Sequence, residues 1–175
     1  MTEFLSWSNS RDAFGVPANM LGSVPEEFYA VVGRVVMVSA IVELRLWDLA
    51  QVLDRTKPQH EYAGKSAQQM INCCGELLAV PEFADLRDEG TALLRRIQTA
   101  FKDRNTVVHS AWPSPTLETA FAWRPVTANK RLRSDPDFTL HLDTDEAWFR
   151  DLILRLVRLV DDLGRFRDRV PTAAS

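Results

Sequence analysis

The sequence predicts a mostly α fold, a four-helix bundle with a β-hairpin inserted between the third and fourth helices. Three observations predict it. Apolar residues recur with helical spacing over four long stretches between residues 25 and 170. A polar loop at 56–66 and two prolines, Pro81 and Pro113, end the first three stretches. Between residues 121 and 142 the apolar period changes from about 3.6 to 2, which is typical of strands.

The first predicted helix runs from about residue 25 to residue 53. Pro25, Glu26 and Glu27 are a favourable opening, because proline fits the first turn and acidic side chains stabilise the positive end of the helix dipole. A seam with spacings of four and three follows, apolar except at one serine: Phe28, Val32, Val35, Ser39, Val42, Leu46, Leu49 and Leu53. A second apolar row is expected to widen this face: Val31, Val38 and Ile41.

Two more helices are expected before the strands. The first covers residues 66–79, with Ser66 as its N-cap. Its predicted buried face consists of Met70, Ile71, Cys74, Leu77 and Leu78. The second covers residues 83–109, and Gly90 is a weak point in it, because glycine is a poor helix former.

The predicted hairpin places Phe121 and Trp123 on one strand, opposite a second strand over residues 138–142. The connecting loop is polar and basic. The last helix is expected over residues 145–170, with Thr144 as a cap. Together these elements predict an irregular N-terminal arm at 1–24, a single helical domain over 25–170 and a disordered tail at 171–175.

Composition limits the possible functions. The chain has 175 residues, 46% hydrophobic, which is enough for one domain with a substantial core. Its net charge of −3 disfavours tight nonspecific binding to duplex nucleic acid, so contact with RNA needs a local basic patch.

The adjacent Cys73 and Cys74 have no zinc spacing and are expected to be reduced core thiols. With neither a secretory signal nor a membrane-spanning apolar run, the sequence predicts a cytoplasmic protein.

The segment KDRNTVVHSAW, at the end of the third predicted helix, carries the residues best suited to chemistry. Asn105 and His109 are four apart and share a helix face, whereas Arg104 lies about 140° from His109 but is long enough to reach toward it. Histidine titrates near neutral pH and can act as an acid or base on a ribose 2′-hydroxyl. An arginine fork suits a phosphate whose charge builds in the transition state, and asparagine could orient the histidine or donate to a phosphate oxygen.

This hexapeptide, from Arg104 to His109, resembles the Arg-x4-His signature of the HEPN superfamily (higher eukaryotes and prokaryotes nucleotide-binding). The polar residue after the arginine is similar to the variant found in its ribonucleases. The resemblance implies a HEPN-like helical bundle, a metal-independent RNase without cofactor, and a homodimer in which two motifs face one cleft. It also implies a role as a toxin or phage-defence effector, controlled by an antitoxin or another regulatory protein.

The chain departs from one part of the family. Toxins paired with nucleotidyltransferases extend the motif with a tyrosine two residues after the histidine, where this chain has Ala111. That difference argues against regulation by nucleotide transfer onto such a tyrosine. A structural interpretation of the motif stays open, because arginine and histidine are also favoured near the negative end of a helix dipole.

Glu43 is the predicted supporting residue. It lies in an apolar run, where an unpaired carboxylate would be costly, so it is expected to pair either with Arg104 or with Arg45, Arg34 or solvent. On the last helix, Arg155, Arg158 and Arg165 have acidic residues four positions away, which predicts a salt-bridged surface. The other two histidines, His60 and His141, have no partner at catalytic spacing.

Four basic residues of the hairpin and its loop are candidates for RNA binding: Arg124, Lys130, Arg131 and Arg133. The motif as a whole predicts a metal-independent endoribonuclease that cleaves single-stranded RNA, with Arg104, Asn105 and His109 as its catalytic residues. Two alternatives remain open. One is a non-catalytic HEPN-like module that binds a nucleotide or a protein, and the other is a structural helical adaptor.

Overall fold

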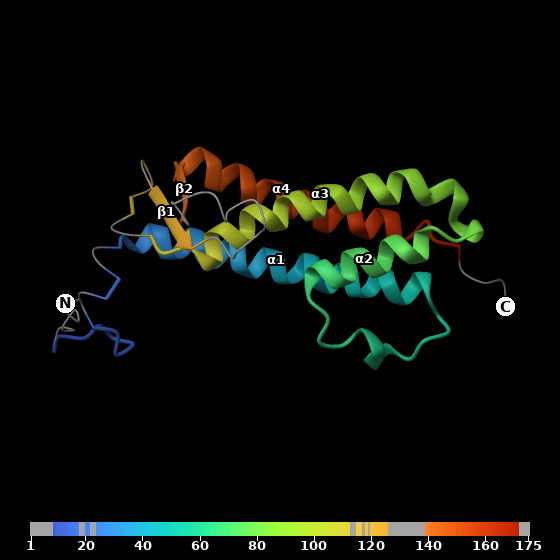
Figure 1. Cartoon of the computed structure of the whole chain (residues 1–175), viewed down its shortest axis with the longest axis horizontal. Coiled ribbons are helices and arrows are strands. Elements are labelled where there is room, and N and C mark those ends of the chain that lie inside the picture. The colour runs from blue at the N-terminus through green and yellow to red at the C-terminus, as the bar shows by residue number, and fades with distance from the viewer. Residues whose placement is uncertain are drawn as a thin grey trace. The chain divides into compact units, whose positions relative to one another are not determined.

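The structure is a computed structural model, and it is mostly α-helical, as the sequence predicts (Figure 1). It describes residues 9–17, 20–21, 24–112, 115–116, 118, 120–125 and 139–171, without the side chains of residues 59, 121, 123–125 and 139–142. Within these residues there are four α-helices and two strands: α1 Glu26–Leu53, α2 Ala67–Leu78, α3 Ala84–His109, β1 Ala120–Pro125, β2 Thr139–Thr144 and α4 Glu146–Arg167. Two short 3-10 helices, η1 Gln59–Tyr62 and η2 Pro81–Phe83, lie before α2 and α3.

The chain divides into two compact units, each built from two separate segments. The helical unit consists of residues Arg34–Asn105 and Arg150–Ser175, and the strand unit consists of Met1–Gly33 and Thr106–Phe149. The helical unit therefore holds α2 and most of α1, α3 and α4, and the strand unit holds β1 and β2.

In the helical unit, the seam of α1 is buried as its spacing predicts. Val35, Val42 and Leu46 are fully buried, and so is Ser39, the one polar residue in the seam. The expected second row is wrong at Ile41, whose side chain is 46% exposed. A residue one position from the seam is rotated by about 100° on a helix, which turns Ile41 out of the buried face.

The short helix α2 runs beside the second half of α1 (Figure 1). It begins with the predicted cap: the Ser66 hydroxyl accepts from the Gln69 amide, and the Gln69 side chain accepts from the Ser66 amide in return. Cys74 is fully buried against α1, and its thiol lies 3.7 Å from the Leu46 carbonyl oxygen. The packing of α2 on α1 thus places Cys74 in the core, as the sequence predicts, whereas Cys73 is only partly buried and the prediction of a core thiol is wrong there.

The helix α3 passes very close to its neighbours at Gly90. A Cβ at this position would lie 2.6 Å from Cδ1 of Leu78 and 2.8 Å from Cζ of Phe166, both of which are buried. The glycine that looks like a weak point in the sequence is therefore required by the close approach of α2 and α4 to α3.

In the strand unit, β1 and β2 pair antiparallel, from Ala120 with Thr144 to Pro125 with Thr139. The predicted cap at Thr144 is wrong. The Thr144 hydroxyl donates instead to the Ala120 carbonyl, and the Asp145 carboxylate accepts from the Trp148 amide at the start of α4. Threonine and aspartate are both good N-cap residues. Thr144 does not cap α4 because it is paired with Ala120 in the sheet, where its side chain is buried.

Three rings pack together in the strand unit: Phe28, Trp112 and Phe149, with centroids 5.4 to 5.6 Å apart. Phe28 meets the other two edge to face, and Trp112 and Phe149 are tilted to each other by 51°. The Trp112 indole N–H also donates to the Val107 carbonyl at 3.0 Å. Of the predicted N-terminal arm, the described residues are non-helical, and Phe14 in a turn there is 92% exposed. None of the described helices is both long enough and apolar enough to cross a membrane.

Candidate functional site around Arg104

Arg104 lies on the buried side of α3. It follows the fully buried Ile97 by seven residues, which places the two within about 20° of each other around the helix. Its side chain is 21% exposed, and its guanidinium carbon lies 6.0 Å from the centre of the Phe101 ring. Arg104 is thus turned toward the core of the helical unit and is not an ordinary solvated surface charge.

Three polar groups hold the Arg104 guanidinium, and all belong to the helical unit. Its Nε donates to the Ser39 hydroxyl at 3.3 Å, and Nη1 donates to the Asn105 side-chain oxygen at 3.1 Å. Its Nη2 lies 3.9 Å from a Glu43 carboxylate oxygen. An arginine has five N–H donors. Nε and Nη1 each make one hydrogen bond and the long contact of Nη2 with Glu43 is an ion pair, so one N–H of Nη1 and both of Nη2 have no hydrogen-bond partner among the described residues.

Ser39 explains why the α1 seam is interrupted at this position. Its buried hydroxyl donates to the Val36 carbonyl at 2.9 Å and accepts from Arg104, so both of its hydrogen-bonding roles are filled. Sequence reasoning did not identify Ser39 as part of the site. The signal was present, because a serine in an otherwise apolar seam needs a polar partner from another helix.

Glu43 pairs with Arg104, which is the first of the two alternatives that its position in α1 suggests. Arg45, the rival partner, lies 3.4 Å from Asp48 instead. The Glu43 side chain is 42% exposed and its contact with Arg104 is long. A partly exposed ion pair of this kind contributes little to stability, so its main effect is to orient the guanidinium.

Asn105 and His109 are both exposed on α3. The Asn105 side-chain oxygen accepts from Arg104, so within the helical unit this asparagine orients the arginine. His109 is the last residue of α3 and belongs to the strand unit. The structure therefore brings together Arg104, Asn105 and Glu43 of the predicted site and adds Ser39 to them.

The predicted RNA-binding side chains lie outside the part of the chain that the structure describes. The backbone of Arg124 lies in β1 opposite Leu140, but its side chain lies outside the described residues. Lys130, Arg131 and Arg133 lie outside them altogether, in the segment between β1 and β2.

A pocket of about 300 Å³ is lined in part by Glu43. It is formed between α1 and the segment from η1 to α2, and includes the half-buried Trp47 and the ammonium-bearing Lys65. The pocket is large enough for a small planar ligand, with an aromatic wall and one charged group of each sign.

The ion pairs of α4 differ in part from those the sequence predicts. Arg155 contacts Asp151 at 2.7 Å, as its spacing suggests. Asp162, however, binds Arg165 one turn later and Arg96 of α3 at 2.6 Å, and not Arg158. The expected surface of pairs within α4 is therefore partly replaced by pairs that join α4 to α3.

No group of three or more histidine, cysteine or acidic side chains within the described part of the chain could hold a metal ion. Comparison of the chain with family models, with curated proteins and with solved structures finds no match.

Proposed function

We propose that this chain is a metal-independent endoribonuclease of the HEPN type that cleaves single-stranded RNA. The observation that carries the proposal is the setting of Arg104. A guanidinium turned inward, held by Ser39, Glu43 and Asn105, with N–H donors left over on Nη1 and Nη2, is a preorganised anion-binding group. It occupies the arginine position of the Arg-x4-His motif.

In the proposed reaction, His109 takes the proton of a ribose 2′-hydroxyl. The 2′-oxygen forms a bond to the adjacent phosphorus, and the bond from phosphorus to the 5′-oxygen breaks. The departing 5′-oxygen receives a proton from the His109 of a second copy, so the products are a 2′,3′-cyclic phosphate and a 5′-hydroxyl. Arg104 stabilises the negative charge that builds on the phosphate, and Asn105 with Glu43 fixes the arginine. DNA lacks the nucleophile.

The proposal includes a homodimer, because one motif supplies few catalytic groups. Three exposed apolar side chains on α1, Met37, Ile41 and Leu44, recur with the spacing of a single helix stripe and favour a protein contact there.

Basic residues of the segment between the strands, with Arg124, would guide the RNA, and an antitoxin or regulatory protein would restrain the enzyme. The biological role proposed is that of a toxin or phage-defence effector.

A second candidate function has its own support. A non-catalytic module that binds a nucleotide or a protein is favoured by the pocket beside Glu43, in which Trp47 could stack on a base and Lys65 could meet a phosphate. Binding of a nucleotide without cleavage of any RNA would favour this second function.

The test is a cleavage assay on labelled single-stranded RNA in the presence of EDTA, with DNA of the same sequence beside it. Wild type should cut the RNA and spare the DNA, and His109→Ala should be inactive. The matched control is His60→Ala, which removes an exposed histidine of η1 and should cut like wild type. Equal activity of His109→Ala would exclude His109 as the acid–base residue.

A further inference from the structure

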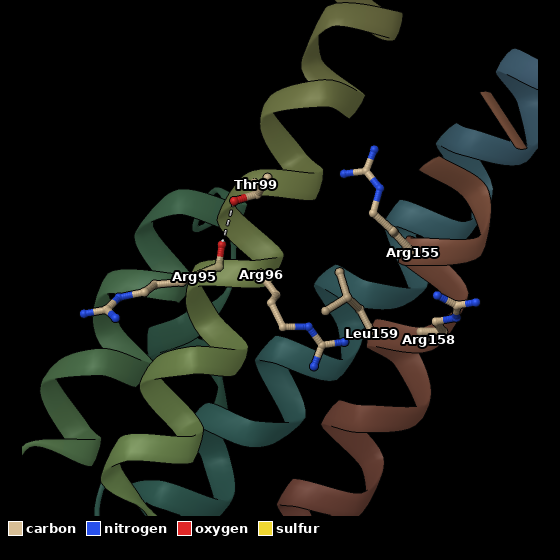
Figure 2. A pocket seen from close by; sticks show the side chains of 6 residues that line it. All are labelled: Arg95, Arg96, Thr99, Arg155, Arg158 and Leu159. Carbon is tan, nitrogen blue, oxygen red and sulfur yellow. Dashed lines mark hydrogen bonds between the residues drawn. The ribbon is translucent and has the colours of Figure 1, made fainter. Parts of the chain in front are cut away.

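A second basic site lies in the helical unit, in a groove between α3 and α4. The groove has a volume of about 370 Å³ and is lined by Arg95, Arg96, Thr99, Arg155, Arg158 and Leu159 (Figure 2). Four of the six lining residues are arginines, and none is acidic. This is unusual in a chain with a net charge of −3.

Acidic neighbours neutralise two of the four arginines. Arg96 lies 2.6 Å from Asp162, and Arg155 contacts both Asp103 at 2.9 Å and Asp151 at 2.7 Å. Arg95 and Arg158 have no carboxylate partner among the described residues. Both are exposed, so their guanidinium groups are open to an anion, Arg158 on α4 and Arg95 at the outer edge of the groove.

The paired arginines also keep donors for a ligand. Arg96 uses only Nη2 in its ion pair, and Arg155 uses Nε and Nη1. In Figure 2, Arg96 extends from α3 toward Leu159, and Arg155 and Arg158 project from α4. Arg95 extends away from α4, at the outer edge of the groove. A planar guanidinium group can donate two parallel hydrogen bonds to phosphate oxygens. Several such groups around an open groove suit a ligand with several phosphates better than a ligand with a single carboxylate.

We infer that this groove binds the phosphates of single-stranded RNA. The inference rests on the proposed function for its choice of ligand and adds a binding surface apart from Arg104. On α3 the groove residue Arg96 lies about 80° from Arg104, so the two arginines face different neighbours. Free nucleotides carry the same phosphate chemistry, and the experiment separates the two sources.

The experiment measures binding without cleavage, using a fluorescent RNA that is 2′-O-methylated throughout and the intact protein. The apparent dissociation constant is recorded over a series of salt concentrations for wild type, Arg95→Ala, Arg158→Ala and the double variant. Log affinity falls with log salt, and each lost phosphate contact should make this negative slope shallower by about 0.7. The double variant, which loses two contacts, should have a slope shallower by about 1.4. The matched control is Arg34→Ala on α1, which also removes an exposed arginine but lies outside the groove and should leave the slope unchanged.

Neither the Arg95 nor the Arg158 side chain has a hydrogen bond or an ion pair with another described residue, so the variants should unfold like wild type, which circular dichroism checks. Slopes equal to that of Arg34→Ala, or no RNA binding by wild type, would overturn the inference. Displacement of the RNA by a nucleoside triphosphate at far lower concentration than by unlabelled RNA would overturn the choice of RNA as the ligand. If cleavage depends on His109 but the groove variants bind RNA like wild type, the proposed ribonuclease function is supported and only the proposal that the groove binds RNA is rejected.

Discussion

At the scale of single residues, Arg104 and Ser39 are the contact on which the candidate site depends. Replacing both by alanine, singly and together, should reveal a coupling free energy of about 1 kcal/mol, the usual net value of a hydrogen bond to a partly exposed charged group. The measurement is urea unfolding of the four proteins. Strictly additive effects would show that the Nε–Oγ hydrogen bond does not stabilise the protein.

The two cysteines should differ from each other in reactivity. Burial raises the pKa of Cys74 to about 12, and burial also raises the pKa of Cys73 above its ordinary value. The thiolate is the reactive form, so both should be slow toward a disulfide reagent at pH 7, and Cys74 should react only as fast as the protein opens. Peptide mapping after timed labelling measures the two rates. Rapid labelling of Cys74 in the folded protein would contradict its place in the core.

At the scale of elements, Gly90 gives the sharpest test of how the helices pack. Gly90→Ala should destabilise the protein by about 1–3 kcal/mol, because the added methyl meets Leu78 and Phe166 in a filled core. Gly164→Ala on α4 is the matched control. Nothing lies within 4 Å of its added Cβ, and alanine is the better helix former by about 1 kcal/mol, so this variant should be more stable than wild type. Thermal unfolding compares them, and equal shifts in both variants would contradict the packing around α3.

The elements also show what could be predicted from sequence. Periodicity placed the four helices, and the cap at Ser66 followed from a local pattern of side chain and spacing. Thr144 and Asp145 could not be ranked as caps, because the choice depends on strand pairing with Ala120, which is distant in sequence. The partnership of Ser39 with Arg104 was missed for the same reason: it joins positions 65 residues apart.

At the scale of the whole molecule, the proposed homodimer makes a distinct prediction. Ile41→Glu places a charge in the exposed stripe of Met37, Ile41 and Leu44 and should convert the dimer to a monomer, because burying an unpaired carboxylate at an interface is costly. Val157→Glu, at a similarly exposed position of α4, should remain dimeric. Light scattering after gel filtration gives the two masses. A monomeric wild type, or dimers in both variants, would show that this stripe is not the interface.

The ends of the RNA fragments show whether the 2′-hydroxyl is the nucleophile. Purified protein is incubated with a single-stranded RNA in EDTA, and the fragments are weighed by mass spectrometry beside those from His109→Ala. A ribonuclease that uses the 2′-hydroxyl leaves 2′,3′-cyclic phosphate and 5′-hydroxyl ends, and the variant should leave the RNA whole. Intact RNA with wild type, or fragments ending in a 3′-hydroxyl and a 5′-phosphate, would contradict the proposed function.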